Sequence, residues 1–147
     1  MIVQLLLGSV LIAATALAAA WSWWVLELIL VRSHRWVTRP PHGPKLIAVL
    51  SLAMLWTLLM MTASVWIWAV ALWALGIFVT FEASVYFALV AFTTLGFGDI
   101  LLPVDWRLLG GLAAANGLLI FGLLTAMLVE TLRQTRLRQR GRFDDFY

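Results

Sequence analysis

TTLGFGD, residues 93–99, is the stretch that decides how this chain folds. Two glycines alternate here with Leu95 and Phe97, and glycine reaches backbone conformations that are closed to residues with a Cβ. A strand with this alternation can aim successive carbonyl groups the same way. The stretch lies between two strongly apolar regions, so its irregular backbone must be buried in protein or line water at membrane depth.

The composition is that of an integral membrane protein. The hydrophobic fraction is 64% and the mean hydropathy is +1.01, whereas roughly half of a soluble domain is apolar. The chain has 9 tryptophans, and this residue favours the level of the lipid headgroups. The sequence has no cysteine, which excludes disulfides and thiolate metal sites.

The positive charges gather beside the apolar stretches. The chain has 10 Lys and Arg residues and a net charge of +3, and only Arg107 lies outside the segments 32–45 and 133–142. Basic segments next to membrane spans stay in the cytoplasm, so this distribution indicates membrane topology and argues against a nucleic-acid partner. The Arg cluster of the segment 133–142 either anchors the topology or binds anionic membrane lipids, and the two interpretations stay open.

Three apolar stretches are long enough to cross a bilayer, which takes about 20 helical residues. They comprise residues 1–31, 46–73 and 108–132, and they predict an all-α membrane protein. The linker 32–45 is predicted to be a basic cytoplasmic loop broken by prolines, which places the N-terminus outside, and residues 133–147 a basic cytoplasmic tail. A cleaved signal peptide is the alternative for the first stretch, but no Lys or Arg precedes it.

Three titratable residues in or near the first span have two interpretations each. Glu27 is a carboxylate inside an apolar stretch, which often marks a functional site, but snorkelling or pairing with the basic loop is the favoured interpretation. Histidine is the residue type that most often serves as a pH sensor, so His34 and His42 are candidates for that role. In an exposed basic loop we expect them to be solvated bystanders.

A shorter apolar segment, residues 82–92, precedes TTLGFGD and is too short to span the membrane. It is predicted to be a re-entrant helix. This segment, the filter-like stretch TTLGFGD and the stretch NGLLIFGLLTAML at residues 116–128 together resemble the pore domain of the potassium channel superfamily in its two-helix bacterial form, whose filter usually reads TTVGYGD. The resemblance covers about half of the chain.

The resemblance implies a pore domain over residues 46–132. Its parts, in chain order, are the outer helix 46–73, the pore helix 82–92, the selectivity filter 93–99 and the inner helix 108–132. It also implies a homotetramer with C4 symmetry, because one chain supplies one filter strand and a carbonyl cage needs four. Residues 1–31 are then an extra N-terminal transmembrane helix, which we expect at the periphery against the outer helix.

The same resemblance assigns roles within the filter. Backbone carbonyls there replace the hydration shell of K+, and they come from Thr94, Leu95, Gly96 and Phe97. The hydroxyl of Thr94 closes the innermost ion site. The residues expected to support the filter or form its outer mouth are Thr93, Gly98, Asp99, Tyr86 and Val90. Of these, Asp99 enriches cations by its charge and is placed to accept a hydrogen bond from Tyr86.

Three residues depart from the usual pattern of the family. Leu95 replaces Val and keeps an apolar side chain. Phe97 replaces Tyr, and the lost hydroxyl removes a hydrogen bond that ties the filter to the pore helix in many relatives. Val90 stands where some relatives carry a buried Glu, so coupling through that acid is not expected. Phe87, beside Tyr86, is expected to be a core residue.

The inner helix is expected to line a cavity below the filter. The residues that face the cavity or its inner constriction, by alignment with the family, are Leu118, Phe121, Thr125 and Val129. Apolar rings at this level can close a pore by dewetting. Gly117 and Gly122 match the glycines of the family's hinge, but glycine also permits close packing. Both roles stay open for Gly117, and packing is preferred for Gly122.

The sequence therefore predicts a potassium channel, with K+ as the transported ion and with neither enzymatic activity nor a cofactor. A weakly selective cation channel is one alternative, because of Phe97. A non-conducting membrane subunit that modulates another channel is a second, which the complete filter argues against. The first span has no repeated Arg, so voltage sensing of the usual kind is not expected. The expected location is the plasma membrane, which in a prokaryote is the inner membrane.

Overall fold

The computed structural model describes residues 1–33 and 41–140. His34 and most of the predicted cytoplasmic loop lie outside the described residues, as does the end of the predicted tail, residues 141–147. Within the described part of the chain every regular element is a helix, which confirms the predicted all-α fold.

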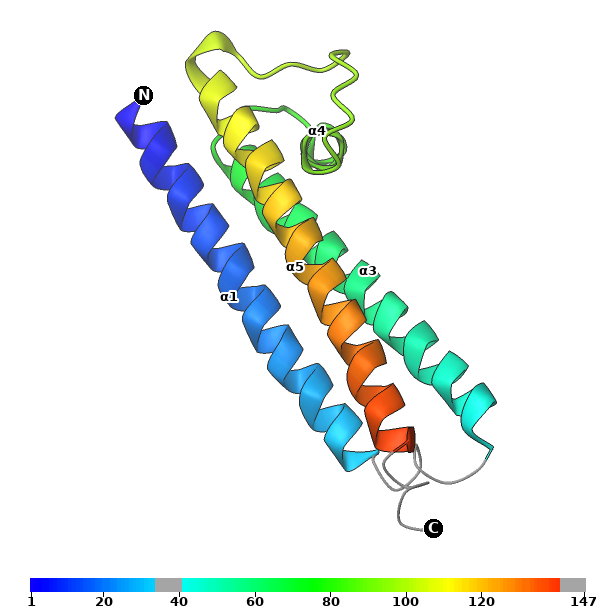
Figure 1. Cartoon of the computed structure of the whole chain (residues 1–147). Coiled ribbons are helices and arrows are strands. Elements are labelled where there is room, and N and C mark those ends of the chain that lie inside the picture. Colours follow the sequence, from blue (N-terminus) through cyan, green and yellow to red (C-terminus); the bar gives the residue numbers. More distant parts are fainter. Residues whose placement is uncertain (34–40, 141–147) are drawn as a thin grey trace.

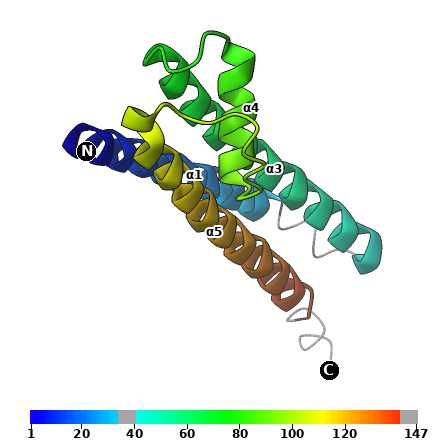
Figure 2. The same cartoon turned by 90° about the horizontal axis from the view of Figure 1, so that it is seen from above.

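Three long helices run side by side along the molecule (Figure 1). They are α1 (Ile2–Arg32), α3 (His42–Ala74) and α5 (Arg107–Arg140). The short helix α4 (Phe81–Phe92) packs against α3 and α5 at one end, and a single turn, η1 (Val104–Trp106), leads into α5. Figures 1 and 2 place the loop between α4 and α5 at the end of the bundle where the N-terminus lies.

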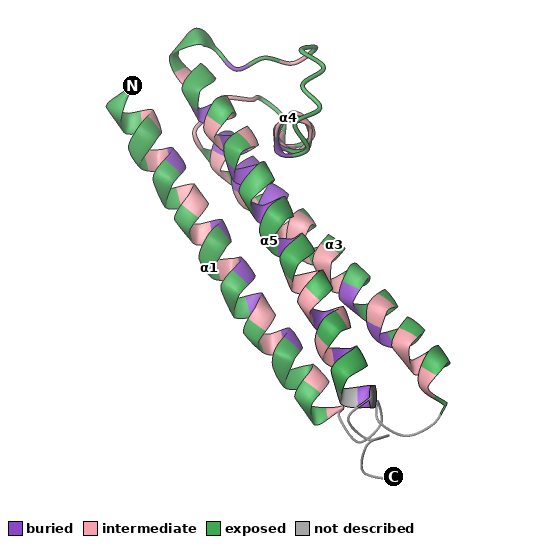
Figure 3. Cartoon of the chain, viewed as in Figure 1, coloured by how far each residue is buried: buried purple, intermediate pink, exposed green. Residues whose placement is uncertain are grey.

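Three helices of the described chain are long and apolar enough to cross a membrane. The spans are Ile2–Arg32, His42–Ala74 and Val104–Leu137, with mean hydropathies of 2.1 to 2.2. Exposed residues follow the whole length of each helix in Figure 3, and many of them are large and apolar. In lipid such exposure carries no penalty, because the acyl chains are as apolar as leucine. The fold is that of a multi-pass membrane protein.

Two helices extend beyond their predicted ends. Helix α5 continues past residue 132 to Arg140, so the first part of the predicted tail is helical. Arg and Gln favour helices, and the Arg133 guanidinium pairs with the Glu130 carboxylate one turn earlier at 3.0 Å. Helix α3 begins at His42 rather than residue 46, and Pro44 lies in its first turn, where a proline removes no helical hydrogen bond.

Gly76 lies in the turn that follows α3. Its φ is +67°, a left-handed conformation that glycine adopts without strain. The N–H of Gly76 donates to the carbonyl of Trp73 at 2.9 Å, and the N–H of Ile77 donates to the carbonyl of Leu72 at 3.2 Å. These two bonds form a Schellman motif, which satisfies the last carbonyls of α3 and turns the chain toward α4.

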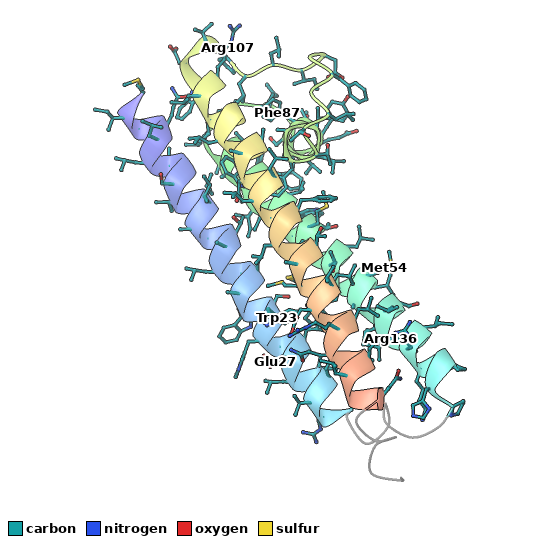
Figure 4. The ribbon with its side chains drawn as sticks, in the orientation of Figure 1. Trp23, Glu27, Met54, Phe87, Arg107 and Arg136 are labelled. Carbon is teal, nitrogen blue, oxygen red and sulfur yellow. The ribbon has the colours of Figure 1, made fainter. Side chains whose placement is uncertain are left out.

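The position of α1 differs from the prediction. This helix packs more extensively against α5 than against α3, so the expected contact with the outer helix is the smaller one. Gly8 allows the close approach, since a Cβ at this position would overlap the Leu112 side chain. Small residues at such contacts let helix backbones approach each other in lipid. Glu27 is exposed on α1 near the end that carries Arg32 (Figure 4).

The N-terminal end of α1 is hydrogen-bonded to the start of α5. The N–H of Leu109 donates to the side-chain oxygen of Gln4 at 3.3 Å, and the Gln4 amide nitrogen donates to the carbonyl of Asp105. Leu109 lies in the first turn of α5, where N–H groups lack a partner within the helix. Gln4 therefore acts as a cap that comes from another helix.

Two further polar contacts hold α1 in place. The amide nitrogen of Asn116 in α5 donates to the hydroxyl oxygen of Thr15 at 2.8 Å, and both side chains are buried. The indole nitrogen of Trp56 in α3 donates to the hydroxyl oxygen of Ser22 at 2.7 Å. Helix α1 is therefore fixed to both of the other spans by side-chain hydrogen bonds.

Replacing Thr15 by valine should destabilise the protein by about 1–2 kcal/mol, because the Asn116 amide would stay buried without its partner. The double variant Thr15→Val/Asn116→Leu should recover much of this loss, since no polar group is then left unpaired. Thermal unfolding of the purified protein in detergent measures both effects. Strictly additive losses would show that the two side chains do not interact.

Candidate functional site

The pore helix α4 is defined by its cap and by one buried face. Thr80 is its N-cap residue, and the Thr80 hydroxyl accepts from the N–H of Ala83 at 3.2 Å. The buried residues of α4 are Ser84, Ala88 and Phe92, and the helix packs against α3 and α5. In Figure 1, α4 is seen end-on, on the side of the upper part of α5 away from α1.

Two glycines of α5 let α4 lie close to it. A Cβ at Gly110 would come within 3.2 Å of the Phe87 ring, which also packs on Phe78 with ring centroids 5.4 Å apart (Figure 4). Phe87 is thus a packing residue, as expected. A Cβ at Gly117 would overlap the carbonyl oxygen of Phe92 and lie 2.7 Å from its Cα. Of the two roles open for Gly117, the structure shows close packing against the end of the pore helix.

The pore helix ends in a second Schellman motif, and this one is strained. The N–H of Leu95 donates to the carbonyl of Val90 at 3.1 Å, and the N–H of Thr94 donates to the carbonyl of Ala91 at 3.0 Å. Thr94 is the left-handed residue of the motif, with φ +57°, and the one described residue other than glycine with a positive φ. This conformation costs an L-residue about 1–2 kcal/mol, and strain of this kind concentrates at functional sites.

Left-handed residues recur at every second position of the filter. Their φ values are +57° at Thr94, +60° at Gly96 and +76° at Gly98, whereas Leu95 and Phe97 have negative φ. Alternating handedness gathers backbone N–H groups on one side of the chain, which leaves the carbonyl groups for the other side. The filter therefore has the kind of backbone that its glycine spacing predicts.

The side chains of the filter differ in how they are held. The hydroxyl of Thr93 donates to the carbonyl of Leu89 at 2.8 Å, which ties the start of the filter back to the pore helix. The side chains of Leu95 and Phe97, by contrast, are 57% and 65% exposed in the single chain. All of residues 93–99 are exposed in the single chain, and irregular backbone at membrane depth needs protein or water around it.

Tyr86 and Asp99 connect the pore helix to the outer end of the filter. The Tyr86 hydroxyl donates to the Asp99 carboxylate at 2.6 Å, which is the hydrogen bond that the sequence predicted. This bond holds the pKa of Asp99 below its ordinary value, with a smaller contribution from the N–H of Ile100, and it raises the pKa of Tyr86. Asp99 is therefore kept ionised beside the filter.

Tyr86→Phe should raise the pH at which Asp99 loses its charge. The hydrogen bond favours the ionised carboxylate, so its contribution is present at neutral pH and is lost as the pH falls through the lowered pKa of Asp99. Without the hydroxyl, the cation current should begin to fall at a higher pH than in the wild type when the solution on the Asp99 side is acidified. Current in planar bilayers during a pH titration measures this. Asp99→Asn should abolish the difference, and coincident titration curves for wild type and Tyr86→Phe would contradict it.

A hollow of about 490 Å³ lies beneath the filter. It is lined by residues from the end of α4 and from the middle of α5: Phe92, Thr93, Thr94, Gly117, Leu118, Phe121 and Gly122. The structure thus brings Thr94 together with Leu118 and Phe121, two of the predicted cavity residues. Apolar side chains form most of its wall, and the threonines stand at its upper end.

The exposed face of α5 continues inward from this hollow. Thr125 and Val129 are exposed on it, and the Thr125 hydroxyl donates to the carbonyl of Phe121 at 2.8 Å. These two predicted residues do not line the hollow itself. A Cβ at Gly122 would meet no atom within 4 Å, so the packing preferred for this glycine is not seen in the single chain.

Two contributions to the site had little signal in the sequence. Val90 was expected to support residues 93–99, and the group that contacts them is its backbone carbonyl, which accepts from Leu95 at 3.1 Å and from Gly96 at 3.4 Å. Asn116 received no role, yet it fixes α1 beside Gly117. Polar residues in otherwise apolar spans were the available signal for this second contact.

The part of the chain that carries these features matches a family model. Residues 46–134 match the model described as an ion channel, which includes most of α3, all of α4, the filter and much of α5, and leaves α1 outside. No curated protein and no solved structure gives a significant match. Since the family model covers more than half of the chain, the protein belongs to the ion channel family, with a two-helix pore domain of the potassium channel type and an additional N-terminal helix.

Proposed function

We propose that four copies of this chain form a potassium-selective channel with TTLGFGD at the central axis. The observation that supports this most strongly is the filter backbone, in which left-handed residues recur at Thr94, Gly96 and Gly98. Carbonyl oxygens aimed at one axis replace the hydration shell of K+ ring by ring. The groups that bind the ion are the carbonyls of Thr94, Leu95, Gly96 and Phe97, with the Thr94 hydroxyl at the inner end.

Assembly into a C4 homotetramer is part of this proposal because a single chain leaves the filter uncovered. Leu95 and Phe97 are exposed, and the hollow beneath Thr94 is bounded on one side only by α4 and α5. Irregular backbone at membrane depth needs protein or water around it. A ring of four copies supplies protein behind each filter strand and a water-filled cavity in front of it.

Electrostatics support the entry of cations at both ends of the filter. At the outer end, the Asp99 carboxylate stays ionised through its hydrogen bond from Tyr86. At the inner end, Phe92 closes α4 and lines the hollow, so the helix terminus with partial negative charge faces the cavity. Both contributions raise the local concentration of cations without selecting among them, and selection is left to the carbonyl rings.

A weakly selective cation channel is the second candidate, and Phe97 favours it. The Phe97 ring is exposed in the single chain and has no hydroxyl with which to bond a neighbouring pore helix. A filter with one restraint fewer holds its carbonyl rings less firmly. Selectivity depends on the number and field of these carbonyls, so a looser filter discriminates less between K+ and Na+.

The reversal potential tests both candidates. Purified protein in planar bilayers is placed between a potassium solution and a sodium solution, and the voltage at zero current is measured. A value near the potassium limit supports the proposal, and a value near zero supports the weakly selective channel. Absence of current over a wide range of voltage and pH would favour the non-conducting modulatory subunit.

We also propose that the protein lies in the plasma membrane, which in a prokaryote is the inner membrane, with its basic segments in the cytoplasm. Arg32 and Lys45 flank the connection from α1 to α3, and Arg133 and Arg136 lie in the last turns of α5. These ends meet at the side of the bundle opposite the filter (Figure 1). Anionic lipid headgroups are the partners that suit this charge.

A further inference from the structure

A hollow of about 380 Å³ lies between α1 and α3, outside the region matched by the ion channel family on the α1 side. Small side chains on the two helices create it, chiefly Ala18 and Ala19 of α1 and Ala63 of α3. Two tryptophans, Trp21 and Trp56, form part of its wall. The hollow exists only because α1 is present, so the two-helix pore domain alone cannot contain it.

In the single chain, the hollow is separate from the exposed face of α5 that lines the space beneath Thr94. All of its lining residues belong to α1 and α3, and none belongs to α5. Helix α5 carries the exposed face with Leu118 and Phe121, so the ion pathway lies against a different helix. Beside the hollow, Leu17 and Trp21 of α1 and Leu59 of α3 are more than half exposed on membrane spans. The medium at this depth is the acyl chains of lipids.

The chemistry of the lining selects an apolar occupant. Both serines and one of the two indoles of the lining have hydrogen-bond partners: Ser64 donates to the carbonyl of Met60 at 3.0 Å, and Ser22 accepts from the indole nitrogen of Trp56 at 2.7 Å. A lipid headgroup or a free polar ligand would find no charged partner in this lining. A hydrocarbon chain needs none, and it gains dispersion contacts with the alanines and indole rings.

The pair Ser22 and Trp56 also separates this hollow from a second, much smaller one. The smaller space, about 10 Å³, is lined by the same pair and by residues of α5, among them Leu124 and Met127. Leu124 is buried and Met127 packs against the same core, so this side of α5 faces the other helices. Trp56 therefore stands between a space open to lipid and the inner helix.

We propose that the hollow between α1 and α3 binds one acyl chain of a membrane lipid, seated against Ala18, Ala19 and Ala63 with Trp56 at its inner wall. The occupied hollow supports Trp56 in its bond to Ser22, and so keeps the smaller space beside α5 closed. An emptied hollow releases Trp56 and leaves α5 less firmly packed at Leu124. The inference rests on the membrane-spanning fold and is independent of ion selectivity.

Photocrosslinking tests the proposal directly. The full chain is reconstituted into phosphatidylcholine vesicles that contain a small fraction of lipid with a photoreactive group on its acyl chain. Peptides from all three spans are then compared by mass spectrometry. Labelling should concentrate on the α1 segment around residues 18–22 and the α3 segment around 56–64. Labelling spread evenly over the exposed faces of all spans would overturn the proposal, since it would indicate ordinary surrounding lipid.

A matched pair of variants sharpens the test. Ala63→Phe fills the hollow and should remove most of the labelling of both segments, whereas Ala13→Phe, on an exposed part of α1 outside the hollow, should leave it unchanged. Ala18→Leu provides a smaller filling change if Ala63→Phe does not assemble. Unchanged labelling in a folded filling variant would overturn the proposal, as would crosslinking of the groove to a second copy of the chain in place of lipid.

Discussion

Gly117→Ala should disrupt the pore domain and abolish ion flux. The added methyl group would overlap the carbonyl oxygen of Phe92 and lie 2.7 Å from its carbonyl carbon, and both are backbone atoms that cannot rotate away. Overpacking of this kind costs about 1–3 kcal/mol or more in each subunit. Phe92 is two residues before Thr94, so any shift that relieves the overlap moves the filter. Potassium flux from loaded vesicles, together with the proportion of assembled oligomer in detergent, measures the loss.

Gly122→Ala is the matched control for this prediction. A Cβ at Gly122 meets no atom within 4 Å in the chain, and alanine favours a helix over glycine by about 1 kcal/mol. Assembly and stability should therefore be preserved in this variant. Equal damage from both substitutions would show that bending of α5, which either alanine opposes, matters more than the contact of Gly117 with the pore helix.

Gly96→Ala should abolish conduction while leaving assembly intact. Gly96 has φ +60°, and the left-handed conformation costs alanine about 1–2 kcal/mol per residue. Nothing lies within 4 Å of the position that a Cβ would take, so the effect comes from the backbone and not from a clash. Relief of the strain turns the peptide plane and removes one carbonyl from the ring in every subunit. Single-channel recording with potassium on both sides measures the effect.

Gly111→Ala provides the comparison for Gly96→Ala. Gly111 lies in α5, has equally open space around it and has no positive φ. This variant should conduct as the wild type does. Wild-type conduction by Gly96→Ala would contradict the proposed filter, because it would mean that the left-handed conformation of this residue is not needed for ion passage.

The sequence was most informative where a local motif leaves few alternatives. The spacing of Gly96 and Gly98 predicted an irregular backbone, and both glycines take a left-handed conformation. The pairing of Tyr86 with Asp99 followed from the resemblance to the family and is present at 2.6 Å. In each case a glycine or a complementary polar pair restricts the local backbone or side-chain conformation, independently of the surrounding packing.

The packing of the spans was less predictable, for a physical reason. In water an amphipathic pattern reveals the buried face of a helix, but in lipid the outer face is apolar as well. Helix α1 is apolar on all sides, so its preference for α5 over α3 depended on Gly8 and on the polar residues Gln4 and Thr15. Such contacts become interpretable when the partner across the interface is known.

The left-handed conformation of Thr94 could not be predicted from its residue type. A β-branched residue disfavours positive φ, so its own preference argues against the left-handed place that it takes. The carbonyls of Val90 and Ala91 accept the hydrogen bonds that hold this turn in place. Every residue has a backbone carbonyl, so the amino-acid types at these positions do not indicate these bonds. The surrounding helix end outweighs the preference of the residue.

The three hydrogen-bonded contacts of α1 described above all lie outside the C-terminal part of α5. Gln4 and Thr15 attach α1 to the N-terminal part of α5, whereas Ser22, farther along α1, attaches it to α3. A swing of the lower half of α5 about Gly117 or Gly122 as a fulcrum would break none of these three bonds. Helix α1 would then stay fixed while the C-terminal part of α5 rotates beside it.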